Sequence, residues 1–122
     1  MNVSPLRPLT VTIAVIGILL GSIHVFAQEL KDKVKVTVSF RKSGTDWPVS
    51  VTLKNESWKT FSDPVVRVRF YNKDGQEVST DAKMYFVTVK KGATKKLETR
   101  IWNDVDTSAV SATGSLDTAV FD

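Results

Sequence analysis

The sequence predicts an all-β protein, a small immunoglobulin-like antiparallel β-sandwich of about six or seven strands. Apolar and polar residues alternate with period two in short segments spaced about ten residues apart, and turn residues separate these segments. After residue 27, no segment of helical length shows an apolar stripe with the helical period. Strands that are apolar on one face need a second apolar layer, so we expect two packed sheets.

The first 27 residues are expected to lie outside this domain. Residues 11–26 are almost wholly apolar, and polarity returns immediately after Ala27. Small or modest side chains at the positions that a signal peptidase reads predict cleavage after Ala27. The apolar run is slightly shorter than the ~20 residues that span a bilayer, which favours a signal peptide (1–27) over an uncleaved membrane anchor (11–26). Both interpretations place residues 28–122 outside the cytoplasm, in the periplasm or secreted.

Length and composition are those of one domain with its own core. The chain has 122 residues, of which 42% are hydrophobic and none is cysteine. Disulfides and a thiol-linked lipid anchor are therefore excluded, and apolar packing must hold residues 28–122 together. The net charge of +4 is a mild basic bias without the clustered density of a nucleic-acid groove, so we expect no nucleic-acid partner.

The first two strands are predicted at 33–40 and 47–54. In each of them, alternate apolar side chains fall on one face and mostly polar side chains on the other. Pro48 cannot donate to a ladder, so we expect it at the start of its strand or on an edge. The predicted inward residues are Val34, Val36, Val38, Phe40, Val49, Val51 and Leu53.

The third strand is predicted at 64–71, after a polar loop at 55–63, with Val66, Val68 and Phe70 inward. The following Asn72-Lys-Asp-Gly75 predicts a type I turn with a glycine bulge, in which Gly75 has a positive φ. A helix-loop-helix calcium site would need glycine at the sixth position rather than the fourth, so we expect no metal there.

The later strands are predicted with weaker patterns. A short return strand at 77–80 is followed by a strand at 84–90 that is apolar on both faces. After a turn, residues 95–102 resume the alternation with Leu97 and Ile101 inward. A last, weaker strand is expected from 110–112 and 116–121.

Catalytic side chains are scarce in the predicted domain. The only histidine, His24, lies in the predicted leader, which excludes Ser-His and Cys-His pairs and the usual zinc ligand sets from residues 28–122. Asp104 and Asp106 form the nearest carboxylate pair for acid-base chemistry, but their polar surroundings favour a solvated turn. We therefore expect no enzyme, cofactor or metal, with an acidic-pair hydrolase as a distant alternative.

Basic and aromatic side chains define a candidate interaction surface. The basic residues could bind an anionic polysaccharide, lipid headgroups or a partner protein, or they could guard strand edges against sheet-to-sheet association. Four aromatic side chains, Trp58, Tyr71, Phe86 and Trp102, could bind a partner or close the ends of the core. Asn55-Glu-Ser57 also matches a glycosylation acceptor. The candidate residues are Arg67, Arg69, Lys90, Lys91, Lys95, Lys96, Trp58 and Tyr71.

Residues 51–57, 65–78 and 87–94 together resemble the FxLYD type of bacterial extracytoplasmic domain. In that family, a strand ending in Asn-Ser, a strand ending in the naming motif before a Lys-Asp-Gly turn, and a Pro-Gly-Glu-like turn occur in this order. The resemblance covers residues 47–102 and departs from the naming motif, which reads Val-Arg-Phe-Tyr-Asn at 68–72. The later turn departs as well, with Lys-Gly-Ala where Pro-Gly-Glu is typical.

The resemblance implies an immunoglobulin-like sandwich in a secreted or envelope protein, and it carries no catalytic residue to transfer. The water-stress and hypersensitive-response domain of plants is a more distant resemblance. We expect an exported, non-enzymatic binding or structural module of the cell envelope, with a protective or chaperone-like envelope protein as the alternative. The expected partner is an envelope protein or an anionic surface polymer, and membrane contact is expected only through residues 11–26 if they stay attached.

Overall fold

A computed structural model of the chain describes residues 27–122. The predicted leader lies outside the described residues, apart from Ala27. Residues 27–32 form a short helix, which the sequence did not predict. The strands that follow are β1 (Val34–Phe40), β2 (Trp47–Asn55), β3 (Phe61–Tyr71), β4 (Glu77–Met84), β5 (Thr88–Val89), β6 (Thr94–Lys96), β7 (Arg100–Trp102) and β8 (Ser111–Phe121).

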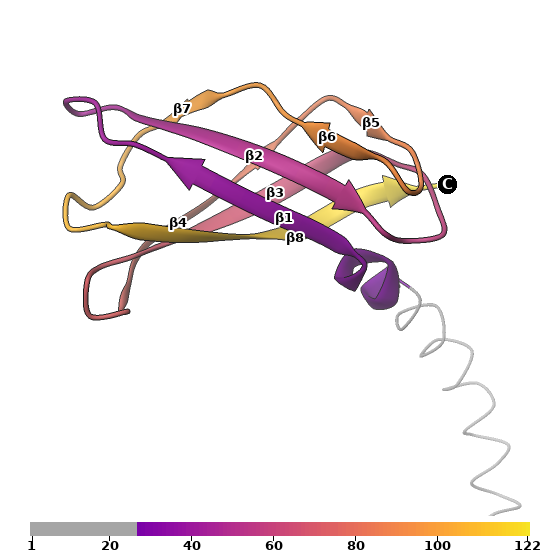
Figure 1. Cartoon of the computed structure of the whole chain (residues 1–122), viewed down its shortest axis with the longest axis horizontal. Coiled ribbons are helices and arrows are strands. Elements are labelled where there is room, and N and C mark those ends of the chain that lie inside the picture. Colours follow the sequence, from indigo (N-terminus) through magenta and orange to yellow (C-terminus); the bar gives the residue numbers. More distant parts are fainter. Residues whose placement is uncertain (1–26) are drawn as a thin grey trace, which may run out of the picture.

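The strands form two antiparallel sheets that pack as a sandwich (Figure 1). In the first sheet β2 is central, with β1 along one edge and β6 and β7 along the other. In the second sheet β3 is central, with β8 along one edge and β4 and β5 along the other. The predicted antiparallel β-sandwich is confirmed.

Along one edge of each central strand, two strands form a single path that is interrupted in the middle. β4 and β5 follow the same edge of β3, and hydrogen bonds from Tyr85 N to Pro64 O (2.9 Å) and from Asp63 N to Val87 O (3.0 Å) continue the pairing between them. β6 and β7 follow one edge of β2 in the same way. The eight strands therefore follow six paths, which agrees with the number predicted.

The core lies between the two central strands. The predicted inward residues of β2 and β3 are all buried, and Pro48 is the second residue of its strand, as expected. Phe70 makes edge-to-face contacts with Phe40 and Trp102, at centroid distances of 5.3 and 6.1 Å. On β1, Val34 is buried, whereas Val36, Val38 and Phe40 are only partly buried.

The predicted inward residues of the 95–102 strand are only half correct. Leu97 is buried and donates its backbone N–H to Val51 O, but Arg100 rather than Thr99 pairs with Val49. One extra residue is thus inserted between β6 and β7, as in a bulge, and it reverses the faces of the residues that follow. Ile101 is consequently 48% exposed, and Trp102 is fully buried.

The other boundary predictions also need correction. The strand predicted at 84–90 shrinks to Thr88–Val89, because β4 runs on to Met84 and an irregular segment follows. The predicted loop at 55–63 is shorter than expected, since β2 reaches Asn55 and β3 begins at Phe61. The weak last strand is in fact the continuous eleven-residue β8, which pairs with β3 along its whole length with two register shifts.

The turn between β3 and β4 is confirmed. Gly75 N donates to Asn72 O (3.0 Å), and Gly75 has a φ of +79°. Asn72 Oδ1 also accepts from the backbone N–H groups of Asp74 and Gln76, at 2.9 and 3.0 Å. The register shifts at the end of β3, as expected for a type I turn with a glycine bulge.

Candidate functional site

Arg67, Arg69 and Tyr71 form a row on the outer face of β3, and each is held by a neighbouring strand. Arg67 Nε lies 2.9 Å from Asp117 Oδ2, and Arg69 Nε lies 3.4 Å from Glu77 Oε1. The Tyr71 hydroxyl lies 3.2 Å from Thr113 Oγ1. The two guanidinium charges are therefore already paired within the sheet, which leaves little free charge for a partner.

The four candidate lysines lie elsewhere, on the turn after β5 and on β6. We call Lys90, Lys91, Lys95 and Lys96 the lysine edge. All four are exposed, and none forms an ion pair with the described residues. β6 pairs with β2 in the first sheet, whereas the arginine row belongs to the second sheet. The structure therefore does not bring the arginines and the lysines together.

Lys95 has an unusual position within the lysine edge. It lies opposite the buried Leu53 in the pairing of β6 with β2, so its side chain starts from the inward side of the sheet. It is exposed nonetheless, because β6 is an edge strand. Inward-pointing charge on an edge strand is a known guard against edge-to-edge pairing, so edge protection accounts for part of this lysine density.

The basic character continues onto the outer face of β1 and β2. Lys35 and Lys54 lie directly opposite each other, and Glu56 bridges them at 3.4 and 3.3 Å. The hydrogen bond from Lys54 is the main cause that lowers the pKa of the Glu56 carboxyl, with Lys35 also contributing. One carboxylate thus offsets the repulsion of two lysines, which leaves this corner positively charged.

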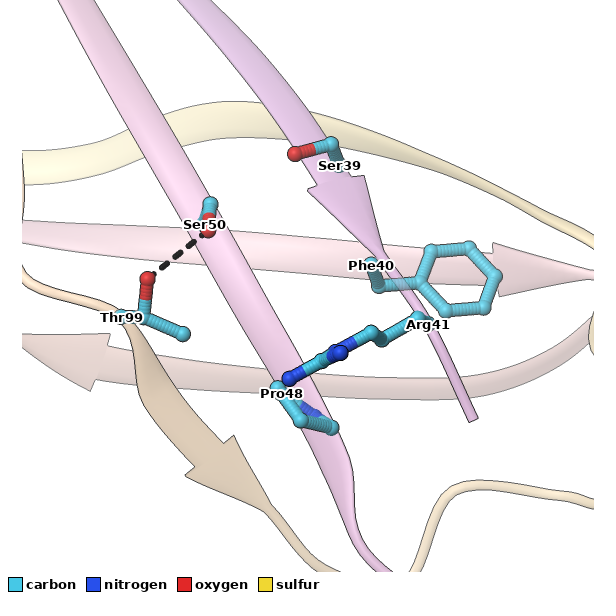
Figure 2. A pocket seen from close by; sticks show the side chains of 6 residues that line it. All are labelled: Ser39, Phe40, Arg41, Pro48, Ser50 and Thr99. Carbon is cyan, nitrogen blue, oxygen red and sulfur yellow. Dashed lines mark hydrogen bonds between the residues drawn. The ribbon is translucent and has the colours of Figure 1, made fainter. Parts of the chain in front are cut away.

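A shallow pocket of about 310 Å³ also lies on the first sheet (Figure 2). Ser50 and Thr99 share a hydrogen bond of 2.9 Å across it, and Arg41 extends toward Pro48. One guanidinium and a few hydroxyls can hold a hydrated anion, but none of these groups is suited to general acid-base catalysis at neutral pH. The lining residues are Ser39, Phe40, Arg41, Pro48, Ser50 and Thr99.

Asp104 and Asp106 lie in the turn between β7 and β8. Ser108 donates its hydroxyl (2.6 Å) and its backbone N–H (2.9 Å) to Asp106 Oδ1, and these bonds lower the pKa of the Asp106 carboxyl. A lowered pKa opposes a role as general acid, and the bonds organise the turn. Asp104 has a φ of +60° and lines a separate pocket of about 270 Å³ beside Asp81 and Trp102.

The candidate aromatic residues divide into exposed and structural side chains. Trp58 is 50% exposed and Phe86 is 80% exposed. Tyr71 is partly buried and hydrogen-bonded to β8, whereas Trp102 belongs to the core. Trp58 and Phe86 are therefore the two candidate aromatic side chains that remain available for a partner.

Asn55, which the sequence suggests as a glycosylation acceptor, is instead a buried structural residue. Its Nδ2 donates to Lys59 O (2.8 Å) and Val89 O (3.1 Å), and its Oδ1 accepts from the N–H and hydroxyl of Ser57, at 3.0 and 2.6 Å. A glycan on Nδ2 would replace one of its two N–H donors, so one of these bonds would be lost, and the sugar would require space in the core. The same Asn-x-Ser spacing that matches the acceptor motif builds this loop.

Residues 27–122 show neither a candidate metal site nor a membrane-spanning helix. In this part of the chain, no group of three or more His, Asp or Glu side chains is arranged to hold a metal ion. No helix here combines the length and apolarity needed to cross a bilayer.

Comparison of the chain with protein-family models, curated proteins and solved structures finds no match. Among the candidate charges of residues 27–122, the lysine edge is the largest group left unpaired.

Proposed function

We propose that the protein is an exported, non-enzymatic module of the cell envelope that binds an anionic surface polymer through the lysine edge. One observation supports this proposal most: the four candidate lysines gather on one turn and one edge strand, exposed and without carboxylate partners among the described residues. The candidate arginines are paired instead.

The charge arrangement suits a polymer better than a small ligand. The lysine edge has no enclosed cavity, and long, flexible lysine side chains interact with anions as point charges rather than as a fixed fork. Several weak contacts to one polymer add up, because each further contact is intramolecular once the first has formed. Exposed charges are also screened by salt over about 10 Å at 0.1 M ionic strength. The proposed binding is therefore multivalent and salt-sensitive.

A matched pair of variants tests this proposal. Lys91→Gln/Lys96→Gln removes two charges from the lysine edge, and Lys42→Gln/Lys73→Gln removes two exposed charges from the β1–β2 and β3–β4 turns. Binding to polyphosphate and to polygalacturonate is measured by calorimetry, with dextran as an uncharged control. The two polyanions distinguish phosphate from carboxylate chemistry.

We expect the lysine-edge variant to bind at least about tenfold more weakly, because each lysine that contacts the polyanion adds a similar increment of affinity. The turn variant should bind nearly as well as the original protein, because its two lysines lie outside the proposed surface. Equal losses in both variants would mean that net charge alone drives the binding. If the original protein bound neither of the two polyanions, the proposal would be contradicted.

The proposed location is supported by the apolar segment at 11–26. The FxLYD resemblance of residues 47–102 is part of the same proposal, since it implies an extracytoplasmic sandwich. Both lines of support come from the sequence.

A protective, chaperone-like role is the second candidate, and the exposure of Trp58 and Phe86 favours it. Exposed aromatic side chains can hold unfolded clients by their apolar faces. Under this alternative, the exported protein should suppress the aggregation of several unrelated clients, and Trp58→Ala/Phe86→Ala should abolish the effect. If the Lys91→Gln/Lys96→Gln variant lost the suppression instead, the aromatic side chains would not be the client site.

A further inference from the structure

The outer edge of β8 is a long strand edge without a partner strand. β8 spans eleven residues and pairs with β3 on one side only. Among residues 27–122, one hydrogen bond reaches its backbone from outside the pairing with β3, from Lys31 Nζ to Asp117 O at 3.3 Å. Unpaired N–H and C=O groups on such an edge are a template for pairing with another strand.

The other outer strands carry charges that oppose such pairing. On β4, Lys83 and Asp81 lie opposite the buried Val66 and Val68 and thus start from the inward side. β6 has Lys95 in the equivalent position. β1 has an exposed lysine, Lys35, on its outward face. These positions match the guards that natural sheets use on exposed edges.

No residue of β8 itself is such a guard, and a charge reaches its outer edge at Asp117 O, from Lys31 of the short helix. The side chains of β8 are small or apolar, and its single charge, Asp117, is paired with Arg67 at 2.9 Å. Its pairing with β3 is regular from Ser111 to Leu116, so the backbone of this segment has the straight geometry that a second strand requires.

The core is also less covered on this side of the sandwich. Nine partly buried hydrophobic residues pack against the core, and six of them lie on β1 or β8. Additional backbone and side chains beside β8 would remove part of this apolar surface from water. These six residues are Val36, Val38, Phe40, Ala112, Ala119 and Phe121.

We propose that the edge of β8 pairs antiparallel with β8 of a second copy of the chain, which joins two second sheets into one continuous sheet. Inward and outward residues stay on their own faces only if the register is even, because a one-residue slip exchanges the faces. A two-fold axis at Gly114 meets this condition.

In this register every pair of facing side chains is compatible. On the outward face, Thr113 lies opposite Ser115 of the second copy within the regular segment. Ser111 faces the bulge at Asp117 of the second copy, where the carboxylate is already paired with Arg67. On the inward face, Ala112 lies opposite Leu116 of the second copy. Hydroxyls thus face hydroxyls or a carboxylate, apolar groups face each other, and no like charges meet. The occupant that fits this uncharged edge is therefore the same strand of another copy.

Two variants with identical charge changes test this proposal. The association state is measured with no anionic polymer present, so the result does not depend on the proposed function. Thr113→Glu/Ser115→Glu places new carboxylates on β8 opposite Arg69 and Arg67 of β3, so the monomer can accommodate them. In the proposed dimer, however, these carboxylates face each other across the two-fold axis. Thr80→Glu/Ala82→Glu is the matched control, because it places two carboxylates beside the same two arginines from β4, on the opposite edge of the sheet.

The association state of the exported protein is measured by sedimentation equilibrium, after a thermal melt has shown that each variant is folded. We expect the original protein and the β4 variant to form dimers, and the β8 variant to dimerise at least tenfold more weakly. The single change Thr113→Glu serves the same purpose if the double variant does not fold. A monomeric original protein at millimolar concentration would overturn the proposal, and so would equal weakening by the β4 variant.

Discussion

Gly114 shows how a contact between the two sheets determines a single residue. A Cβ atom at this position would lie 2.5 Å from Val36 Cγ1 and 2.5 Å from Val38 Cγ2, far inside normal contact distance. Glycine is required here because β1 passes close over β8, and not because the backbone needs a positive φ. The same glycine interrupts the apolar alternation of β8, which is why the sequence predicts a weak, broken strand there.

We therefore expect Gly114→Ala to lower the free energy of unfolding by about 1–3 kcal/mol through overpacking. In Gly114→Ala/Val38→Ala, one of the two clashing methyl groups is removed. The double variant should then be less destabilised than the sum of the single variants, because the two positions are in contact. Urea unfolding measures all three values, and strictly additive losses would contradict the close approach of β1 to β8.

Asn55 is a second case in which the fold gives a residue another role. Its position in an Asn-x-Ser sequence suggests a surface modification, and its burial could not be predicted from sequence, because the groups that it binds include Val89 O, 34 residues away. Buried polar residues are identified by their partners, and long-range partners leave no local pattern.

Among the elements, the strands with unbroken alternation could be predicted from the sequence. The inward faces of β2 and β3 are as expected, since each of these strands has its apolar side chains on one buried face. β7 could not be predicted correctly, because one extra residue before it reverses its faces, and such an insertion is visible only in the pairing with β2.

Glu56 adds two exposed ion pairs to the pairing of β1 with β2, and they give the stability a small dependence on pH. The pKa of the Glu56 carboxyl is lowered by its hydrogen bond with Lys54 and by Lys35. Because the folded pKa lies below the ordinary value of 4.5, this stabilisation is present above that pH and is lost as the pH falls through the folded pKa.

We therefore expect acidification below pH 4.5 to lower the urea midpoint of the original protein more than that of Glu56→Gln. The glutamine keeps the size of the side chain but cannot titrate. If both proteins lost stability in parallel, Glu56 would not contribute to the pH dependence.

At the scale of the whole molecule, the candidate surface could be predicted only in its residue types. The sequence places arginines and lysines on several strands, but whether they share a face depends on which of the two sheets each strand joins. The structure pairs the arginines on the second sheet and places β6, with its lysines, on the first. The carboxylates that pair with Arg67 and Arg69 are Asp117 and Glu77, which lie on other strands, so the sequence does not show these pairs.

The proposed leader gives a prediction for the chain as a whole. We expect the exported protein to begin at Gln28, because the side chains before it suit a signal peptidase. Intact-mass measurement of the protein recovered outside the cytoplasm tests this directly. A chain that still begins at Met1 would show that residues 11–26 act as an anchor.

The most direct test of the proposed function is to map the polymer-binding surface by nuclear magnetic resonance. Polyphosphate is titrated into the isotopically labelled protein, and backbone amide shifts are followed at low and at raised salt. We predict that the largest shifts fall on the turn after β5 and on β6, at Lys90, Lys91, Lys95 and Lys96, and that raised salt reduces them. Largest shifts at Arg67 and Arg69 on the outer face of β3, or no shifts at all, would contradict the account.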